Sequence, residues 1–241
     1  MNLAEMTWVD AEQALAKATI ALVPVGAVEV YGPHLPQGSD GFAAQAFAAR
    51  LAERVDAVVT PLVPVGCSQV LMSFPGTLSV SPEALKAYLS DLCDSLVHWG
   101  IRRILFVNGH AGNVPHIADI CRELMDQGVK CAQIDWWRAV YRAGEDLTES
   151  GELANGHAAE VGTSVLKAIR PDLVVEERIK AELPKRGLAG AYPEVLQYDI
   201  PYRAMTASGV VGDPTSGNAA KGEAMIERLL DRVEAYLKEW Q

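Results

Sequence analysis

Three clusters of polar residues in this sequence contain the types of side chain that bind metal ions or transfer protons. The first is the stretch 24–40, where three glycines and three prolines surround Glu29, Tyr31 and Asp40. Carboxylate oxygens are hard ligands that Mn²⁺, Zn²⁺ and Mg²⁺ accept, so Glu29 and Asp40 are candidate metal ligands. Taken singly, each has a simpler interpretation, because Glu29 fits a surface position and Asp40 fits the N-cap of a helix beginning at Gly41.

The second cluster is Asn108-Gly109-His110-Ala111-Gly112-Asn113, directly after an apolar stretch. A histidine between glycines at the end of a strand has room for a ligand, so His110 is a candidate metal ligand. The alternative is a turn in which the two asparagines satisfy backbone groups while His110 faces water. The spacing matches neither glycine-rich nucleotide-binding motif, and nucleotide binding is not expected.

The third cluster contains His157 and Glu160, three residues apart in a predicted helix. That spacing places both side chains on one face, where they could bind a metal or act as general acid and base. A surface ion pair on a solvated helix is the alternative.

Other polar residues suggest chemistry less strongly. No Gly-x-Ser-x-Gly motif marks a serine hydrolase. Cys67 is a possible nucleophile near a strand end, although a buried structural thiol is the favoured interpretation. Trp136 and Trp137 fit core packing, with one of them as a possible pocket wall.

The bulk properties exclude several classes of protein. A chain of 241 residues is at the upper size for one hydrophobic core, so a single domain spanning 1–241 is expected. A net charge of −10 disfavours binding to nucleic acid. Four scattered cysteines indicate free thiols, and neither a signal sequence nor a membrane span is recognisable, so we expect a cytoplasmic protein.

The elements that position these clusters follow from hydrophobic periodicity. Buried strands are predicted at 19–25, 57–63, 103–108 and 130–135, and helices at 41–55, 81–98, 114–127, 155–169 and 219–240. Residues 181–207 are predicted to form a long structured loop with short strands. This alternation is typical of an α/β fold with a mostly parallel sheet covered by helices on both faces. In such folds the functional site lies at the carboxyl ends of the strands.

Taken together, the clusters resemble the creatininase family over nearly the whole chain. The family's Gly-Ser-x-Glu-Gln-His-Gly-Pro-His-Leu-Pro-x-x-Thr-Asp is similar to residues 26–40, and its Asn-Gly-His-Gly-Gly-Asn is similar to 108–113. Its His-Ala-Gly-Glu-x-Glu-Thr-Ser is similar to 157–164. Residues 74–79 read Phe-Pro-Gly-Thr-Leu-Ser, as in the family, and 209–214 are similar to a further family signature.

The resemblance implies a three-layer αβα sandwich, often assembled into homo-oligomeric hexamers, that binds two divalent ions such as Zn²⁺ or Mn²⁺. Such enzymes hydrolyse C–N bonds of small cyclic or formyl amides, and a few relatives open cyclic ketones. By position, Glu29, Asp40 and His110 match family metal ligands, with Asp40 bridging both ions. His157 matches a proton-shuttling histidine.

Three departures from the family motifs affect the metal centre. Tyr31 replaces a histidine ligand, while Gly162 and Gly112 stand where the family has glutamates. Tyrosine is a poor zinc ligand at neutral pH because its hydroxyl titrates near pH 10. The second metal site is therefore incomplete, unless Glu160 supplies a ligand or a proton.

The sequence therefore predicts a metal-dependent amidohydrolase with one or two ions. Leu153 and Ala154 replace the aromatic and acidic residues that precede the histidine in creatininases, which disfavours creatinine as the substrate. Three alternatives remain. One is a single-metal enzyme in which Tyr31 is a catalytic hydroxyl, and another is a degenerate relative, with one metal or none, that binds a small molecule without turnover. The third is a ring-opening hydrolase of a cyclic ketone.

Overall fold

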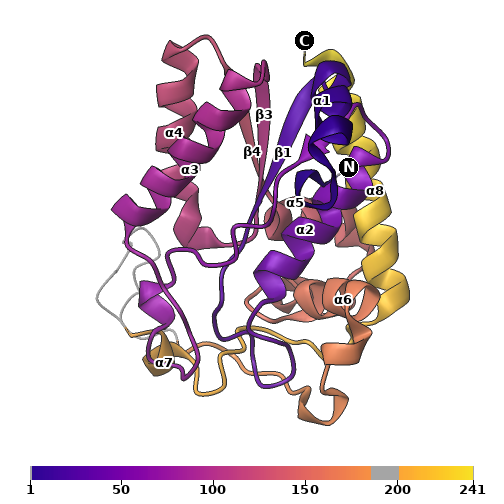
Figure 1. The fold of residues 1–241 in the computed structure, drawn as a ribbon. Helices are drawn as coiled ribbons and strands as arrows, with labels where there is room; N and C mark the ends of the chain where they lie inside the picture. Colours follow the sequence, from indigo (N-terminus) through magenta and orange to yellow (C-terminus); the bar gives the residue numbers. More distant parts are fainter. Residues whose placement is uncertain (1, 186–200, 241) are drawn as a thin grey trace.

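A computed structural model of the chain describes residues 2–185 and 201–240 (Figure 1). Four parallel strands form its sheet in the order β2-β1-β3-β4. Their bounds are β1 Ile20–Val25, β2 Ala57–Val59, β3 Arg103–Asn108 and β4 Lys130–Asp135. The predicted α/β architecture is confirmed.

Helices cover both faces of the sheet, as Figure 1 shows, and give three layers. One face packs against α3 (Pro82–His98) and α4 (Val114–Asp126). The other packs against α2 (Ser39–Ala52), α5 (Trp136–Gly144), α6 (Glu160–Ile169) and α8 (Ala219–Glu239). The remaining helices are α1 (Trp8–Lys17), next to β2, and the single-turn α7 (Tyr202–Met205).

The pleat of the central strands explains why both faces are covered. Leu22 and Leu105 point toward the α2 side, whereas Val23 and Phe106 point toward the α3 side. Successive side chains of a strand point to opposite faces, so a strand that is apolar throughout must be buried on both sides. Every residue of β1 is buried, as this requires.

Several predicted boundaries shift for local reasons. β2 ends at Val59 instead of residue 63, because Pro61 has no N–H to donate to the ladder. α2 begins at Ser39 with Gly38 as its N-cap, so the interpretation of Asp40 as the N-cap is wrong. α6 begins at Glu160 instead of residue 155, since residues 155–159 form turns in which Ala158 has a φ of 53°.

Three helices were not predicted from the sequence: α1, α5 and α7. Of the predicted loop 181–207, residues 186–200 lie outside the described residues, and the part that follows them contains α7. Within the described part of the chain, no helix has the length and apolar character to cross a bilayer.

The strand order places a topological switch point between β1 and β3. Val25 at the end of β1 is paired with Asn108 at the end of β3, and Asn108 is paired with Asp135 at the end of β4. Because the chain leaves these strands in opposite directions along the sheet, a crevice opens above their carboxyl ends. The first and second polar clusters both follow strands that end here.

A buried ion pair fastens α8 to the start of α6. Lys221 donates to the Glu160 carboxylate, which is fully buried, and also to Glu149 at 2.9 Å. The backbone N–H groups of Glu149 and Ser150 donate to the same Glu160 carboxylate at 3.0 and 2.8 Å. Each buried charge is therefore paired and hydrogen-bonded.

We expect Lys221→Met to lower the free energy of unfolding by about 3–5 kcal/mol, because it leaves the Glu160 charge buried without a cation. Lys238→Met is the matched control, since Lys238 is exposed in its pair with Glu234 and should matter by less than about 0.5 kcal/mol. Urea denaturation followed by circular dichroism measures both. Equal losses of unfolding free energy in the two variants would contradict a structural role of the buried Lys221–Glu160 pair.

His34 joins the loop after β1 to α6 and is buried. Its Nε2 hydrogen-bonds with the Thr163 hydroxyl at 2.9 Å, and its Nδ1 has no partner among the described residues. Burial first, and then the charge of Lys167, lowers the pKa of His34 from 6.5 to about 4, against the opposing effect of Glu176. The imidazole is therefore neutral in the folded protein at neutral pH.

This depressed pKa predicts a pH dependence of stability. The unfolded chain binds a proton near pH 6.5 and the folded chain only near pH 4, so the free energy of unfolding should fall as the pH drops through that window. The loss attributable to His34 is roughly 3 kcal/mol at most. Denaturation of the wild type and of His34→Gln from pH 7 to 4 isolates the contribution of His34. If the free energy of unfolding fell in parallel with pH in both proteins, that contribution would be excluded.

Candidate metal centre

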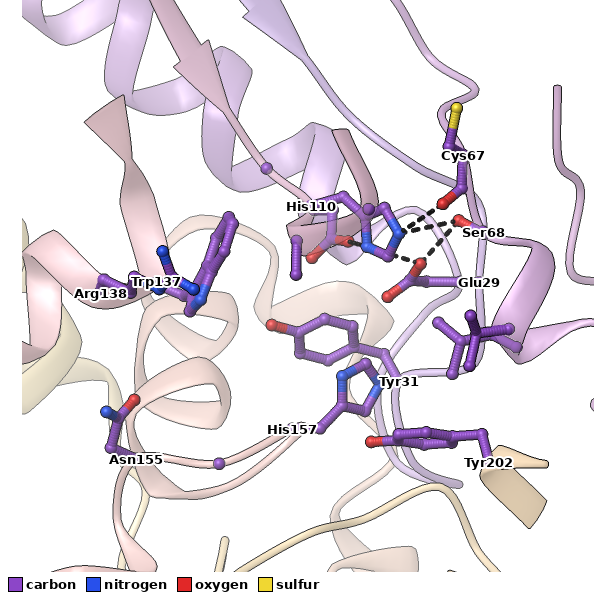
Figure 2. Close-up of a pocket in the computed structure, with 17 residues that line it drawn as sticks. Glu29, Tyr31, Cys67, Ser68, His110, Trp137, Arg138, Asn155, His157 and Tyr202 are labelled. Atoms are coloured by element: carbon purple, nitrogen blue, oxygen red, sulfur yellow. Dashed lines mark hydrogen bonds and ion pairs between the residues drawn. The ribbon is translucent and has the colours of Figure 1, made fainter. Parts of the chain in front are cut away.

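Glu29, Asp40 and His110 converge above the carboxyl ends of β1 and β3. Each offers a ligand atom within 4.8 Å of the other two, and all three side chains are buried. His110 Nδ1 lies 2.8 Å from Glu29 Oε2 and 3.3 Å from Asp40 Oδ2. Figure 2 shows the imidazole beside the Glu29 carboxylate at one side of a cavity. His110 therefore does not face water, although its flanking asparagines do satisfy backbone groups.

Neighbouring groups orient two of these side chains. His110 Nε2 donates to the Cys67 carbonyl oxygen at 3.1 Å, which leaves Nδ1 directed at the carboxylates. The Ser68 hydroxyl donates to Glu29 Oε2 at 2.7 Å. Histidines that bind metals commonly donate their second ring N–H to a backbone carbonyl, and this bond selects the tautomer whose free nitrogen binds the ion. Ser68 had no signal in the sequence.

The charges in the cluster match those of a cation site. Burial, followed by the charge of Glu29, raises the pKa of Asp40 from 3.8 to about 7 against the effect of His110. Burial opposes a charge on His110, but its contacts with Asp40 and Glu29 raise the pKa of the imidazole to about 10. Asp40 Oδ2 is buried, and its 3.3 Å contact with His110 Nδ1 lacks the geometry of a hydrogen bond. Buried carboxylates require a positive charge nearby, and a divalent ion between these side chains would supply it.

Two asparagines hold the loops that carry the ligands. Asn108 donates from Nδ2 to the His110 carbonyl oxygen at 2.9 Å, and its Oδ1 accepts from the His110 N–H at 3.1 Å. Asn113 accepts from the Cys67 N–H at 3.0 Å and donates to the Gly26 carbonyl oxygen at 3.1 Å. These bonds fix the segments that carry Gly26, Cys67 and His110 to one another.

Tyr31 and Gly162, two of the departures from the family motifs, are neighbours in space. A Cβ atom placed on Gly162 would lie 3.2 Å from Tyr31 Cε1 and 3.4 Å from its hydroxyl oxygen. A longer side chain at position 162 would therefore compete with the tyrosine ring. The ring thus lies against the position from which the family's second glutamate would extend.

Gly112, the third departure, also excludes a further ligand. A Cβ atom there would lie 2.6 Å from His110 Nε2 and closer still to the Cys67 carbonyl oxygen. No side chain fits at this position in the present loop conformation. The described residues hold one group of potential metal ligands, composed of Glu29, Asp40 and His110.

His157 lines the same cavity, between two tyrosine rings. Its ring centroid is 4.7 Å from that of Tyr31 and 5.4 Å from that of Tyr202. Nε2 donates to the Val30 carbonyl oxygen at 2.6 Å, so the neutral ring carries its free electron pair on Nδ1. Burial lowers the pKa of His157, against the charge of Glu29 and the bond to Val30, which keeps the imidazole neutral at physiological pH.

The structure does not bring Glu160 to this cluster. His157 precedes α6, so the two residues do not share a helical face. The Glu160 carboxylate is instead bound by Lys221 and by two backbone N–H groups. Burial raises the pKa of Glu160, but these hydrogen bonds outweigh it and the net pKa is lowered. The sequence led us to expect that Glu160 binds metal or transfers protons. In the structure its carboxylate has a structural role instead.

The cavity has a volume of about 500 Å³, within the range of small-molecule sites. Trp137 forms part of its wall, whereas Trp136 is in the core and donates to the Gly109 carbonyl oxygen at 3.1 Å. Figure 2 shows the Cys67 sulfur pointing away from the cluster, and burial raises the pKa of this thiol, so it is a poor nucleophile. All four cysteines are free.

Comparisons with known proteins agree with this geometry. The family model described as creatininase, creatinine amidohydrolase, matches residues 4–237. A mycofactocin precursor peptide peptidase of Mycolicibacterium smegmatis is 33% identical, covering 92% of this chain and 85% of that protein. The creatinine amidohydrolase of Pseudomonas putida is 27% identical, with coverages of 98% and 95%. A solved structure described as creatininase Mn superposes with a TM-score of 0.81 at 26% identity, covering 99% of this chain and 97% of that one.

We expect the wild-type protein to retain one divalent ion per chain after dialysis, and Asp40→Asn and His110→Ala to lose it. Elemental analysis measures the content, and added Zn²⁺ or Mn²⁺ should raise the melting temperature of the wild type only, since a ligand at 100 times its Kd stabilises by about 2.7 kcal/mol. His98→Ala, an exposed histidine at the end of α3, is the control. A His110→Ala protein that still holds wild-type amounts of ion would contradict this assignment.

Proposed function

This chain belongs to the creatininase family, and from that premise we propose that it is a hydrolase that cleaves an amide C–N bond with a single divalent ion held by Glu29, Asp40 and His110. The observation that carries the proposal is the convergence of three buried ligand atoms, with His110 Nε2 beside the Cys67 carbonyl oxygen and Nδ1 directed at the two carboxylates. The lack of ligands at positions 31, 112 and 162 supports one ion in place of two.

A bound ion would supply Lewis-acid chemistry, since it polarises the amide carbonyl and makes water nucleophilic near neutral pH. Zn²⁺ and Mn²⁺ both accept carboxylate and imidazole ligands, and we infer that the ion is one of these. The first function of the protein's own residues is to hold the ion rigidly, and Ser68 and the Cys67 carbonyl group contribute by orienting Glu29 and His110.

We propose that Tyr31 stabilises negative charge on the substrate. Figure 2 shows its hydroxyl directed into the cavity between Trp137 and the Glu29–His110 cluster. Burial first, and then the charges of Asp40 and Glu29, raises the pKa of Tyr31 well above 10, so the hydroxyl stays protonated. A preorganised O–H donor strengthens its hydrogen bond as the carbonyl oxygen becomes negative in the transition state. We infer that Tyr31 takes over part of the role of a second cation.

We propose that His157 transfers the proton. Its Nε2 is committed to Val30, so Nδ1 can accept the proton of the attacking water and then donate it to the departing nitrogen. A neutral imidazole is required for the first of these steps, and burial favours it. The two tyrosine rings restrict the imidazole to one orientation.

The relatives widen the expected substrate beyond cyclic and formyl amides. One of them is named for cleavage of a precursor peptide and another for creatinine, so both linear and cyclic amides occur among them. A cavity of about 500 Å³ has room for a peptide-sized group. We propose a linear, peptide-like amide as the substrate class.

We expect Tyr31→Phe to lower kcat by roughly 10²–10³-fold through loss of one donor to the developing oxyanion. His157→Gln should lower kcat by about 10²–10⁴-fold through loss of proton transfer. Both variants should hold as much ion as the wild type. The assay measures hydrolysis of a panel of formyl amides, lactams and short peptides with added Mn²⁺ or Zn²⁺.

Tyr88→Phe is the matched control, since Tyr88 is exposed on α3 and should leave kcat unchanged. If Tyr31→Phe retained wild-type kcat, the catalytic hydroxyl would be excluded. If the wild type bound its ion but hydrolysed no member of the panel, the result would favour a relative that binds without turnover.

A further inference from the structure

The lining of the cavity includes one permanently charged cationic side chain in addition to the candidate metal ligands. Among the described residues that line it, Arg138 is the only arginine or lysine. It belongs to the first turn of α5, directly after Trp137. Figure 2 places Trp137, Arg138 and Asn155 on the opposite side of the cavity from Glu29, Ser68 and Cys67. A positive side chain thus lies across the cavity from the acidic cluster.

Arg138 is held in place but keeps free donors. Its Nη1 donates to Asp135 Oδ2 at 3.1 Å, and its Cζ lies 5.6 Å from the Trp137 ring centroid. Its Nε and Nη2 have no hydrogen-bond partner among the described residues, and its side chain is 58% exposed. A guanidinium group has five N–H donors in a plane, and two parallel donors match the two oxygens of a carboxylate.

Asp135 connects Arg138 to the candidate metal centre. Its Oδ1 accepts from Asn108 Nδ2 at 2.8 Å and from Gln133 Nε2 at 2.6 Å, while Oδ2 accepts from Arg138. Asn108 in turn hydrogen-bonds with both the N–H and the carbonyl oxygen of the His110 backbone. An ordinary surface ion pair would lack this connection. The guanidinium group and the metal ligand are therefore positioned by the same network.

Asn155 adds an uncommitted donor at the same side of the cavity. Its side chain lines the cavity and has no hydrogen-bond partner among the described residues. It lies two residues before His157, in the turn that leads into α6. An amide N–H₂ group on the same side of the cavity as a guanidinium group can satisfy a second lone pair on a carboxylate oxygen.

We propose that Arg138 and Asn155 form a carboxylate-binding subsite, so that the enzyme selects amides whose amine portion carries a free carboxylate, such as the carboxyl-terminal bond of a short peptide. This inference rests on the proposed function and narrows its substrate class to amides with a free carboxylate. In the reaction, the oxygen of water bonds to the acyl carbon, the C–N bond breaks, and the departing nitrogen takes a proton. The products are a carboxylate and an amino acid whose carboxylate was held by Arg138.

Electrostatics favour this arrangement. A divalent ion would balance Glu29 and Asp40, which leaves Arg138, paired with Asp135 through one nitrogen only, as the charged side chain of the described lining that still has free donors. The whole chain carries a net charge of −10, so an anionic substrate would otherwise be repelled. A local cation in a partly desolvated cavity provides both attraction and orientation.

The test compares two substrates that differ in one group: an N-acetyl dipeptide and its carboxyl-terminal amide. We expect the wild type to prefer the acid, and Arg138→Gln to lower kcat/KM for the acid by about 10- to 100-fold more than for the amide, mainly through KM. Arg138→Lys should restore part of the preference, since it keeps the charge but loses the planar donors. Arg122→Gln is the matched control, because Arg122 forms the same type of pair with Asp119 three residues earlier, on α4.

Binding without turnover separates the two proposals. Calorimetry measures the affinity of an N-acetyl amino acid and of its amide for the wild type and for Arg138→Gln. Selective binding of the acid that depends on Arg138, with no hydrolysis of either dipeptide, would reject the hydrolase and keep the subsite. Hydrolysis with equal effects of Arg138→Gln on acid and amide, or with no effect on either, would overturn the subsite and keep the hydrolase.

Discussion

The burial of two carboxylates beside one imidazole is the interaction on which the site depends. Glu29 and Asp40 lose their hydration and repel each other, which is why the pKa of Asp40 rises to about 7. Such a pair is stable only where other groups fix it and a cation balances it. The fold provides the first condition by joining the ends of β1 and β3 and by using Asn108 and Asn113 to tie the loops together. A divalent ion would provide the second.

The site combines one set of ligands with neutral hydrogen-bonding groups. Tyr31 offers a protonated hydroxyl, and His157 offers a neutral imidazole whose free nitrogen is set by its bond to Val30. Positive charge is therefore concentrated at the proposed ion and, across the cavity, at Arg138. This separation gives the cavity a polarity that a linear substrate with one anionic end would match. Substrate orientation and chemistry would then follow from the same arrangement of charge.

The sequence predicted the parts of the structure that local patterns determine. The four strands and five of the helices follow from runs of apolar residues and from signals such as the Ser81 N-cap, whose hydroxyl accepts from the Ala84 N–H. The family motifs also led to Glu29, Asp40 and His110. The function of Glu160 was not predictable, because its partner Lys221 is 61 residues away. Ser68, Arg138 and Asn155 likewise gave no signal, since their place in the cavity depends on how separate loops meet.

The contact between Tyr31 and Gly162 has an evolutionary consequence. A glutamate introduced at position 162 alone would meet the tyrosine ring, and a histidine introduced at position 31 alone would still face a glycine at position 162. Neither single change builds a second ion site, and a third change at position 112 meets the Cys67 carbonyl group. A second set of ligands like that of the family motifs would therefore require coordinated substitutions at these positions. Such epistasis would make the proposed one-ion site difficult to convert by single mutations.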